Sequence, residues 1–436
     1  MAGNLEDSEG TISDGQDISR KRFLRWTGLT AATGMLGWPL APLAGGNGRR
    51  QRERISRILR EYDAQGDHRT GTSVDAMSAR WLAHRIRAMD VEASLEALPF
   101  SRTVIVASYV ESVAGGEAGG SSIQGVPLFD APATGPDGIT GTVGPLGSRA
   151  HIGMLRLAPY QGGELTRHRQ ESKHRAIIVV TGGEAFAMPE GLALFNAPAY
   201  RQPFGSPVLQ VGSDAWPRLQ QMTADGATVR LVAHSTRQTL EIFNVTATVT
   251  GTRPDLAPLM VMTPRSGWWT CASERGGGIA VWLEMIRHLQ RLRPARSTHF
   301  LASTGHELGH YGLDEYLRAR KDLIRGAVAW IHLGANFGAA LGAGTLLQTS
   351  DEQMQTLALG PMKTAGCTPD TLQPPGDRPL GEAVNIHEGG GRYISILGRN
   401  RVFHHQYDRW PAAVDPEAVL AFAKAFAAIG ARLTEA

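Results

Sequence analysis

The stretch STGHELGHYG, residues 303–312, spells H-E-x-x-H from His306 to His310. On a continuous helix this spacing would place the two histidines on one face as zinc ligands, with Glu307 as a general base. Glycines interrupt the stretch, however, and each glycine costs roughly 1 kcal/mol inside a helix. The residues just before it, STHFLAST (297–304), favour a strand. We therefore predict a loop at the end of a strand, where chemistry collects in open α/β sheets.

The segments that flank this loop alternate between strand and helix patterns. Short apolar runs typical of buried strands occur at residues 258–264, 326–334 and 392–398. Residues 277–292 carry apolar side chains at helical spacing. A last helix is predicted to begin at Asp415-Pro416-Glu417, which combines a capping side chain, a proline at the first position and an early acid. This alternation predicts an α/β fold with a mostly parallel central sheet and helices on both faces.

The texture of the sequence changes between residues 105 and 238. Short β-like pieces such as AIIVVTGG (176–183) alternate there with loops rich in glycine and proline. This pattern predicts an inserted β-rich domain. The α/β domain would then consist of residues 49–104 and 239–436.

Residues 1–48 are predicted to be a leader and an export signal. Residues 1–18 carry five acids and no bases, which is typical of disorder. The segment SRKRFL (19–24) resembles a twin-arginine signal in which Lys21 replaces the second arginine. The apolar run that follows is short for a membrane span. We expect export to the periplasm or beyond, with a membrane anchor if the signal is not cleaved; an amphipathic N-terminal helix is the alternative.

Composition excludes some kinds of partner. The formal net charge of the 436 residues is only +3, and the lysines and arginines are scattered. No basic stripe with interleaved aromatic residues appears, so we predict no nucleic-acid partner. Cys271 and Cys367 are too few for a disulfide framework or a four-thiolate zinc site. They either form one bridge or are two buried thiols.

From about residue 66 to the end, the order of elements resembles the double-zinc aminopeptidase family, which includes glutamate carboxypeptidase-like and glutaminyl cyclase-like members. The inserted segment resembles a protease-associated domain. The family carries a G-E-E-L-G motif after a strand, in which the first glutamate is the base and the second binds zinc. The corresponding residues here are Gly305-His306-Glu307-Leu308-Gly309. The resemblance thus implies that Glu307 is a metal ligand and that His306 occupies the position of the base.

The same resemblance assigns two further ligands. Phe403-His404 followed by Asp408 corresponds to the family's Tyr-His and an aspartate four residues later, so His404 falls on a histidine ligand. Glu274 in ERGGG falls on the aspartate that bridges the two metals.

Two other ligand positions of the family carry residues that cannot bind a metal through a side chain. Pro264 stands where the family has the histidine of His-x-Asp, and Gly334 stands where it has a strand-end aspartate. The chain therefore loses the ligands of one zinc and keeps Glu274, Glu307 and His404 for the other.

For function, the resemblance implies metal-dependent hydrolysis of a peptide or of another small amide substrate. One zinc ion would be held by Glu274, Glu307 and His404 with water in the fourth position. His306 would accept the proton in place of the usual glutamate.

Two alternatives remain open. The same losses are typical of a catalytically inactive relative, in which the inserted domain and a cleft at Trp268 and Trp269 bind a peptide or protein. The second alternative is an H-E-x-x-H metalloprotease that uses His306, Glu307 and His310.

Overall fold

The computed structural model describes residues 45–113, 122–342 and 344–435. Residues Arg49–Ala436 form one compact unit, and the preceding unit, Met1–Gly48, lies almost wholly outside the described residues. The predicted twin-arginine signal falls there as well. No helix in the described part of the chain is both long and apolar enough to cross a membrane.

The central sheet has four parallel strands in its middle. These are β9 (Thr298–Ser303), β8 (Leu259–Pro264), β10 (Ala329–Leu333) and β13 (Tyr393–Gly398), which pair in that order. Antiparallel neighbours flank them, namely β7 (Thr228–Val249) beside β9, and β11 (Thr345–Thr349) beside β13, with the short β12 (Thr371–Leu372) outermost. The apolar runs of β8 and β10 are buried on both faces, as parallel strands require.

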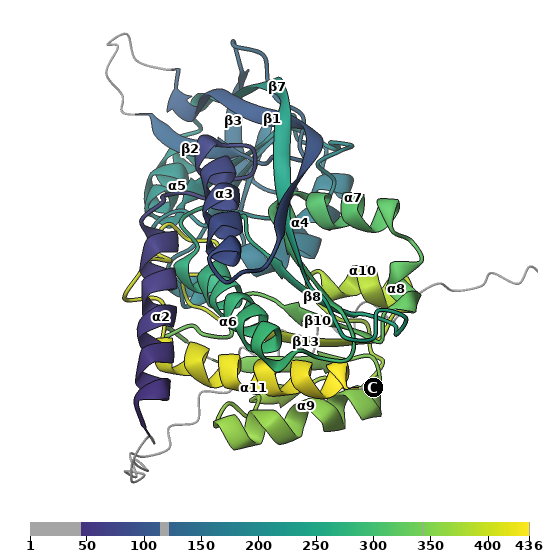
Figure 1. The fold of residues 1–436 in the computed structure, drawn as a ribbon. Helices are drawn as coiled ribbons and strands as arrows, with labels where there is room; N and C mark the ends of the chain where they lie inside the picture. Colours follow the sequence, from purple (N-terminus) through teal and green to yellow (C-terminus); the bar gives the residue numbers. More distant parts are fainter. Residues whose placement is uncertain (1–44, 114–121, 343, 436) are drawn as a thin grey trace, which may run out of the picture. The chain divides into compact units, whose positions relative to one another are not determined.

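Helices cover both faces of this sheet (Figure 1). Successive side chains of a strand point to opposite faces, so Val261 and Met262 belong to different hydrophobic cores. One core packs against α2 (Gly45–Asp63), α3 (Ser73–Arg87), α6 (Gly277–Leu292), α9 (Glu352–Ala365) and α11 (Pro416–Thr434). The other packs against α7 (Tyr311–Ala319), α8 (Leu323–Gly326) and α10 (Ala383–Glu388). The predicted α/β fold is confirmed.

Helix α11 shows how local sequence fixes an element. The Asp415 carboxylate accepts a hydrogen bond of 2.9 Å from the backbone N–H of Glu417, and Pro416 begins the helix. The predicted start of this helix is thus confirmed. Its apolar face packs on α6 and α9, which ties the C-terminus to the sheet.

Two long strands connect the central sheet to the inserted segment. Strand β1 (Ala93–Ser112) pairs with β7 in antiparallel fashion, from Ala93 opposite Ala247 to Ser112 opposite Val229. The predicted boundaries at residues 105 and 238 lie within these strands. The register shifts between Ile105 and Ala107, so a bulge lies close to the first boundary.

The inserted segment adds five strands between β1 and β7. They are β2 (Ile123–Pro127), β3 (Ile139–Pro145), β4 (Ile152–Arg156), β5 (Ala176–Thr181) and β6 (Val208–Gly212). The pairings run β1–β2–β6–β5–β4–β3–β7, and since β7 also pairs with β1, they close into a circuit. Helices α4 (Gly162–Glu171) and α5 (Trp216–Ala224) pack on this β-rich part.

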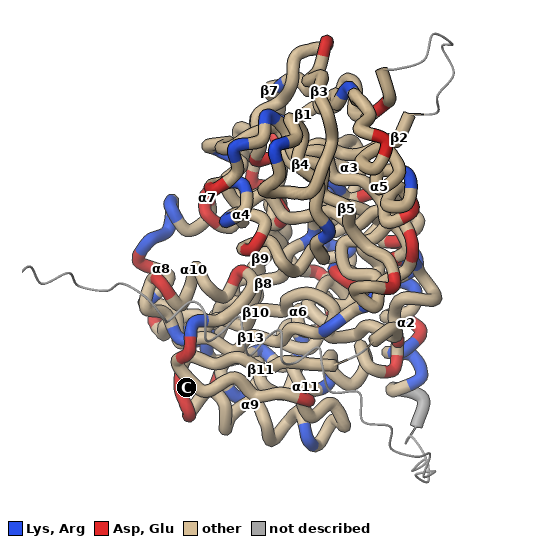
Figure 2. Tube along the Cα trace, turned by 180° about the vertical axis from the view of Figure 1, so that it is seen from behind, with Lys and Arg blue, Asp and Glu red and all other residues tan. Residues whose placement is uncertain are grey.

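Acidic and basic residues are interspersed along the described chain (Figure 2). Cys271 and Cys367 are both buried and free, so no bridge joins them.

Candidate functional site

The loop that follows β9 is built from left-handed backbone rather than from a helix. Gly305 and Gly309 have φ of 74° and 75°, and His310 has φ of 58°. Only His306–Leu308 form a single 3-10 turn between them. A Cβ on Gly309 would lie 2.5 Å from the Pro198 carbonyl oxygen, so glycine is required there. The predicted loop is confirmed, and the alternative of an H-E-x-x-H zinc helix is wrong.

Glu307 points into the protein and is fully buried. Its Oε1 accepts hydrogen bonds from the Thr70 backbone N–H at 3.1 Å and from the Thr70 hydroxyl at 2.6 Å. Its Oε2 accepts a hydrogen bond of 2.8 Å from the Ser266 hydroxyl. The same two hydroxyls accept the N–H of Gly305, which fixes the loop against the end of β8. Neutral donors therefore satisfy both oxygens of this carboxylate.

Glu274 lies in a π-helical turn, Ala272–Gly276, that leads into α6. It is fully buried, and its Oε1 lies 2.7 Å from Nη2 of the buried Arg275. Neither carboxylate oxygen forms a hydrogen bond of good geometry, so the attraction between the two groups is chiefly electrostatic. Burial alone would raise the pKa of Glu274, but the charges of Arg275 and His404 lower it on balance. The carboxylate is therefore ionised and neutralised by a guanidinium.

His404 faces Glu274 from the other side. Its Nε2 lies 3.3 Å from Glu274 Oε1, and its Nδ1 lies 2.7 Å from the carbonyl oxygen of Leu194. A carbonyl can only accept, so Nδ1 carries the proton and Nε2 is directed at the carboxylate. Leu194 lies within residues 105–238, so this segment orients a side chain that follows β13 of the central sheet.

His306 forms a pair with a residue that the sequence analysis did not identify. Its Nδ1 lies 3.2 Å from Oε1 of Glu382, at the start of α10, and its ring stacks on that of His310 at 4.9 Å. Glu382 is fully buried and accepts further hydrogen bonds from the Ser303 hydroxyl. Burial, aided by the charge of Arg275, holds the pKa of His306 well below its ordinary value. His306 is thus a neutral imidazole at pH 7.

Two more histidines lie close to this pair. His310 binds Asn385 through Nδ1 at 2.8 Å. His332 on β10 binds the Ser395 hydroxyl at 2.9 Å, whereas its buried Nε2 has no hydrogen-bond partner. Burial lowers the pKa of His332 to about 3. Both histidines are hydrogen-bonded to a side chain through Nδ1, and in His332 this is the only ring nitrogen with a partner among the described residues.

Neither a protein-family model nor a curated protein sequence matches the chain. Solved structures do resemble it. A zinc aminopeptidase from Bacillus subtilis superposes with a TM-score of 0.69 at 14% identity, covering 89% of this chain and 95% of that one. A peptidase M28 precursor from Shewanella amazonensis gives 0.68 at 14% identity, with coverage of 89% and 96%. An aminopeptidase from Aneurinibacillus sp. strain AM-1 gives 0.65 at 13% identity, with coverage of 89% and 95%.

This chain has the zinc aminopeptidase fold. The part of the chain left out of these superpositions is shorter than residues 105–238. At least part of the inserted segment therefore superposes as well.

The three predicted ligands, Glu274, Glu307 and His404, are not arranged in this structure to bind a zinc ion. The oxygens of Glu307 are occupied by three hydrogen bonds, and Glu274 is paired with a guanidinium. In the residues that the structure describes, no group of three or more His, Cys, Asp or Glu side chains could hold a metal. The structure brings Glu274 and His404 together but gives Glu307 other partners.

The end of β10, where the resemblance predicts a missing ligand, has no space for an added side chain. A Cβ on Gly334 would lie 2.2 Å from Cδ2 of Leu397 and 2.8 Å from Cε1 of His332. An aspartate therefore has no room there unless its neighbours move. At the end of β8, Arg265 follows Pro264 and forms a buried ion pair of 2.8 Å with Asp75.

The sequence did not indicate that Glu382, Thr70 and the Leu194 carbonyl contact the site residues. Thr70 precedes the site residues by more than two hundred positions, and Glu382 follows His306 by 76. No motif links such distant residues, and a backbone carbonyl has no signature in a sequence. The one contact of the site that the sequence could indicate is the ion pair of Arg275 with Glu274, because the two residues are adjacent.

Proposed function

We propose that this protein is a peptide-binding protein with the fold of a zinc aminopeptidase, and that it does not hydrolyse its ligand. The main support for the absence of hydrolysis is the buried ion pair between Arg275 and Glu274. The resemblance places Glu274 at the position of the aspartate that bridges the family's two metals. A guanidinium now supplies the positive charge at that carboxylate.

Electrostatics make zinc and this guanidinium competitors. Two unit charges about 4 Å apart repel by roughly 4 kcal/mol at an effective dielectric constant of 20, and a divalent ion doubles this value. Arg275 is almost fully buried, so water does little to screen it. Zinc would therefore have to displace the guanidinium and break the hydrogen bonds of Glu307.

Hydrolysis with a single zinc ion is the second candidate, and His404 favours it. Metal-binding histidines typically donate their other ring N–H to a carbonyl or carboxylate, which fixes the tautomer. The Nδ1 of His404 does so towards Leu194. In this second candidate Glu274 and His404 would hold the zinc, which would supply a Lewis acid, and Glu382 would orient His306 to receive a proton at Nε2.

Zinc binding and hydrolysis of a panel of peptides and amino-acid amides by the full chain distinguish the two candidates. We expect no zinc bound at micromolar concentrations and no hydrolysis with or without added zinc. We expect Arg275→Ala to bind zinc more tightly than the wild type, because it frees the Glu274 carboxylate.

About one zinc per chain in the wild type would overturn the proposal if His404→Ala removes it and His310→Ala, the matched control, retains it. Hydrolysis that depends on that zinc would establish the second candidate instead.

A further inference from the structure

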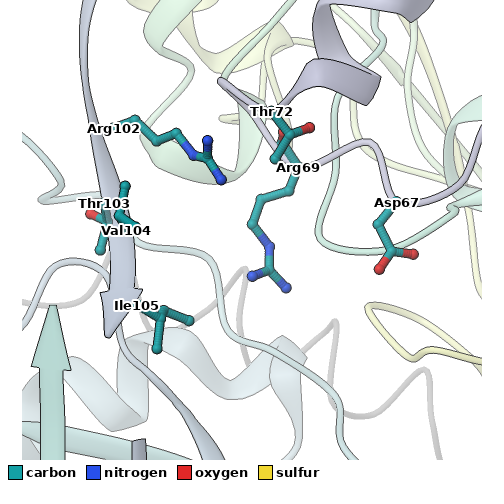
Figure 3. A pocket seen from close by; sticks show the side chains of 7 residues that line it. All are labelled: Asp67, Arg69, Thr72, Arg102, Thr103, Val104 and Ile105. Atoms are coloured by element: carbon teal, nitrogen blue, oxygen red, sulfur yellow. The ribbon is translucent and has the colours of Figure 1, made fainter. Parts of the chain in front are cut away.

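A pocket of about 300 Å³ lies beside β1 (Figure 3). Its walls come from the loop before α3 and from β1, and its lining residues are Asp67, Arg69, Thr72, Arg102, Thr103, Val104 and Ile105. This volume is at the low end for ligand pockets and suits one or two residues of a peptide.

Arg69 is held in the pocket by aromatic rings. Its guanidinium carbon lies 5.9, 5.8 and 5.6 Å from the ring centres of Phe129, Trp268 and Trp269. Among the residues that the structure describes, it forms one hydrogen bond, from Nη2 to the Trp268 carbonyl, which is long at 3.5 Å, and its buried Nε has no partner there. The aromatic rings fix the position of this cation but leave most of its donors unused.

Arg102 enters the same pocket from β1, and Figure 3 shows Asp67 on the far side of Arg69 from it. Asp67 is exposed and accepts a hydrogen bond of 3.3 Å from the Thr270 hydroxyl. Burial lowers the pKa of Arg69, the charges of Asp67 and Glu307 oppose this effect, and the charge of Arg102 lowers the pKa further. The side chains that line the pocket therefore carry two positive charges and one negative charge, which lies at the exposed rim.

The hydroxyls of Thr72 and Thr103 already have hydrogen-bond partners within the protein. The Thr72 hydroxyl donates to the Arg69 carbonyl and accepts the N–H of Asp75, so it serves as the helix cap. The Thr103 hydroxyl is paired with the Tyr200 hydroxyl at 3.1 Å. The guanidiniums are thus the groups available to bind a ligand, while Val104 and Ile105 offer an apolar wall.

The pocket is joined to the candidate site by the chain itself. Thr70, next to Arg69, is the residue that binds Glu307. Trp268 and Trp269, which pack on Arg69, follow Ser266, the other partner of Glu307. A ligand in the pocket would therefore lie next to the loop that carries Glu307.

We infer that this pocket binds a carboxylate of the peptide ligand, through Arg69 and Arg102. The inference rests on the proposed peptide-binding function and names the group that the site recognises. Planar guanidiniums match the two oxygens of a carboxylate, and such charge-assisted bonds are the strong ones. Both a C-terminal carboxylate and an acidic side chain present this chemistry.

Three pools of random pentapeptides test the inference on the full chain by equilibrium dialysis with mass spectrometry. The first pool has free C-termini and lacks Asp and Glu. The second has the same sequences with amidated C-termini. The third is amidated and carries a central Glu.

We expect the first or the third pool to bind about tenfold more tightly than the second, and which of the two does so identifies the source of the carboxylate. Arg102→Gln should reduce this preference to within about twofold. Arg80→Gln, which removes an exposed charge from α3, should leave it unchanged. Thermal unfolding of both variants checks that they fold.

Equal binding of the three pools, or a preference that survives Arg102→Gln, would overturn the inference while leaving peptide binding intact. Failure of every pool to bind would overturn the proposed function, and this inference with it.

Discussion

Glu274 and Glu307 are both fully buried carboxylates of one site, yet the protein stabilises them in different ways. Glu307 is held by one backbone N–H and two hydroxyls, all uncharged donors. Glu274 faces a buried guanidinium and makes no hydrogen bond of good geometry with it. Glu274, unlike Glu307, therefore relies on direct contact with a charged group, and a metal could have supplied that charge.

The same substitution at the two positions should therefore have unequal effects, and the largest is expected at Glu274. Glu274→Gln leaves the Arg275 guanidinium buried without its anion, which typically costs about 3–5 kcal/mol. We expect this loss in the free energy of unfolding measured with urea at pH 7. The double variant Glu274→Gln, Arg275→Met should recover most of it, because no buried charge is left unpaired.

A double variant no more stable than Glu274→Gln would contradict the role of the ion pair. Arg80→Gln serves as the control for the loss of a positive charge at an exposed position.

Lowering the pH should also reduce the free energy of unfolding through Glu274, by an amount between the other two effects. The pKa of Glu274 is lowered in the folded protein, so below about pH 4.3 the unfolded chain takes up a proton that the folded chain does not. The stability from this group is present above that pH and is lost as the pH falls, by up to about 1.4 kcal/mol per pH unit. Urea unfolding from pH 6 to pH 3 should show a shallower decline in the double variant. Equal slopes would show that Glu274 is not held ionised.

The smallest effect is expected at Glu307. Glu307→Gln keeps a carbonyl oxygen for both donors of Thr70 and disturbs only the contact with Ser266. The loss should be about 1 kcal/mol, that of one hydrogen bond. Urea unfolding beside Glu274→Gln measures the ratio directly. Equal losses at the two positions would mean that Glu307 is also held by charge.

Much of the fold was predictable because it rests on local patterns. The apolar runs of β8 and β10 and the capped start of α11 carry their structure in neighbouring residues. The glycines at 305 and 309 likewise predicted the loop, because glycine destabilises a helix interior, and both have the left-handed backbone that excludes a helix. The closed circuit of strands was not predictable, because it depends on pairings between residues far apart in the chain.

The site was less predictable than the fold. A motif could place His306 and Glu307 on one loop and His404 near Glu274, and the structure does bring His404 and Glu274 within 3.3 Å. It could not show that Thr70 and Ser266 occupy Glu307, nor that Glu382 binds His306. These partners are set by tertiary packing, which no short stretch of sequence encodes.

The paired strands β1 and β7 also have a consequence for the order of folding. The pair from Ala93 and Ala247 onward closes a loop that contains the whole inserted segment, so the edge of the central sheet waits on the ordering of that segment. Contacts between residues so distant in sequence form slowly, because the entropy of the loop must be lost first. We therefore expect those amides of β9 that bond to β7 to gain protection from hydrogen exchange only after the amides of β4 and β5 during refolding.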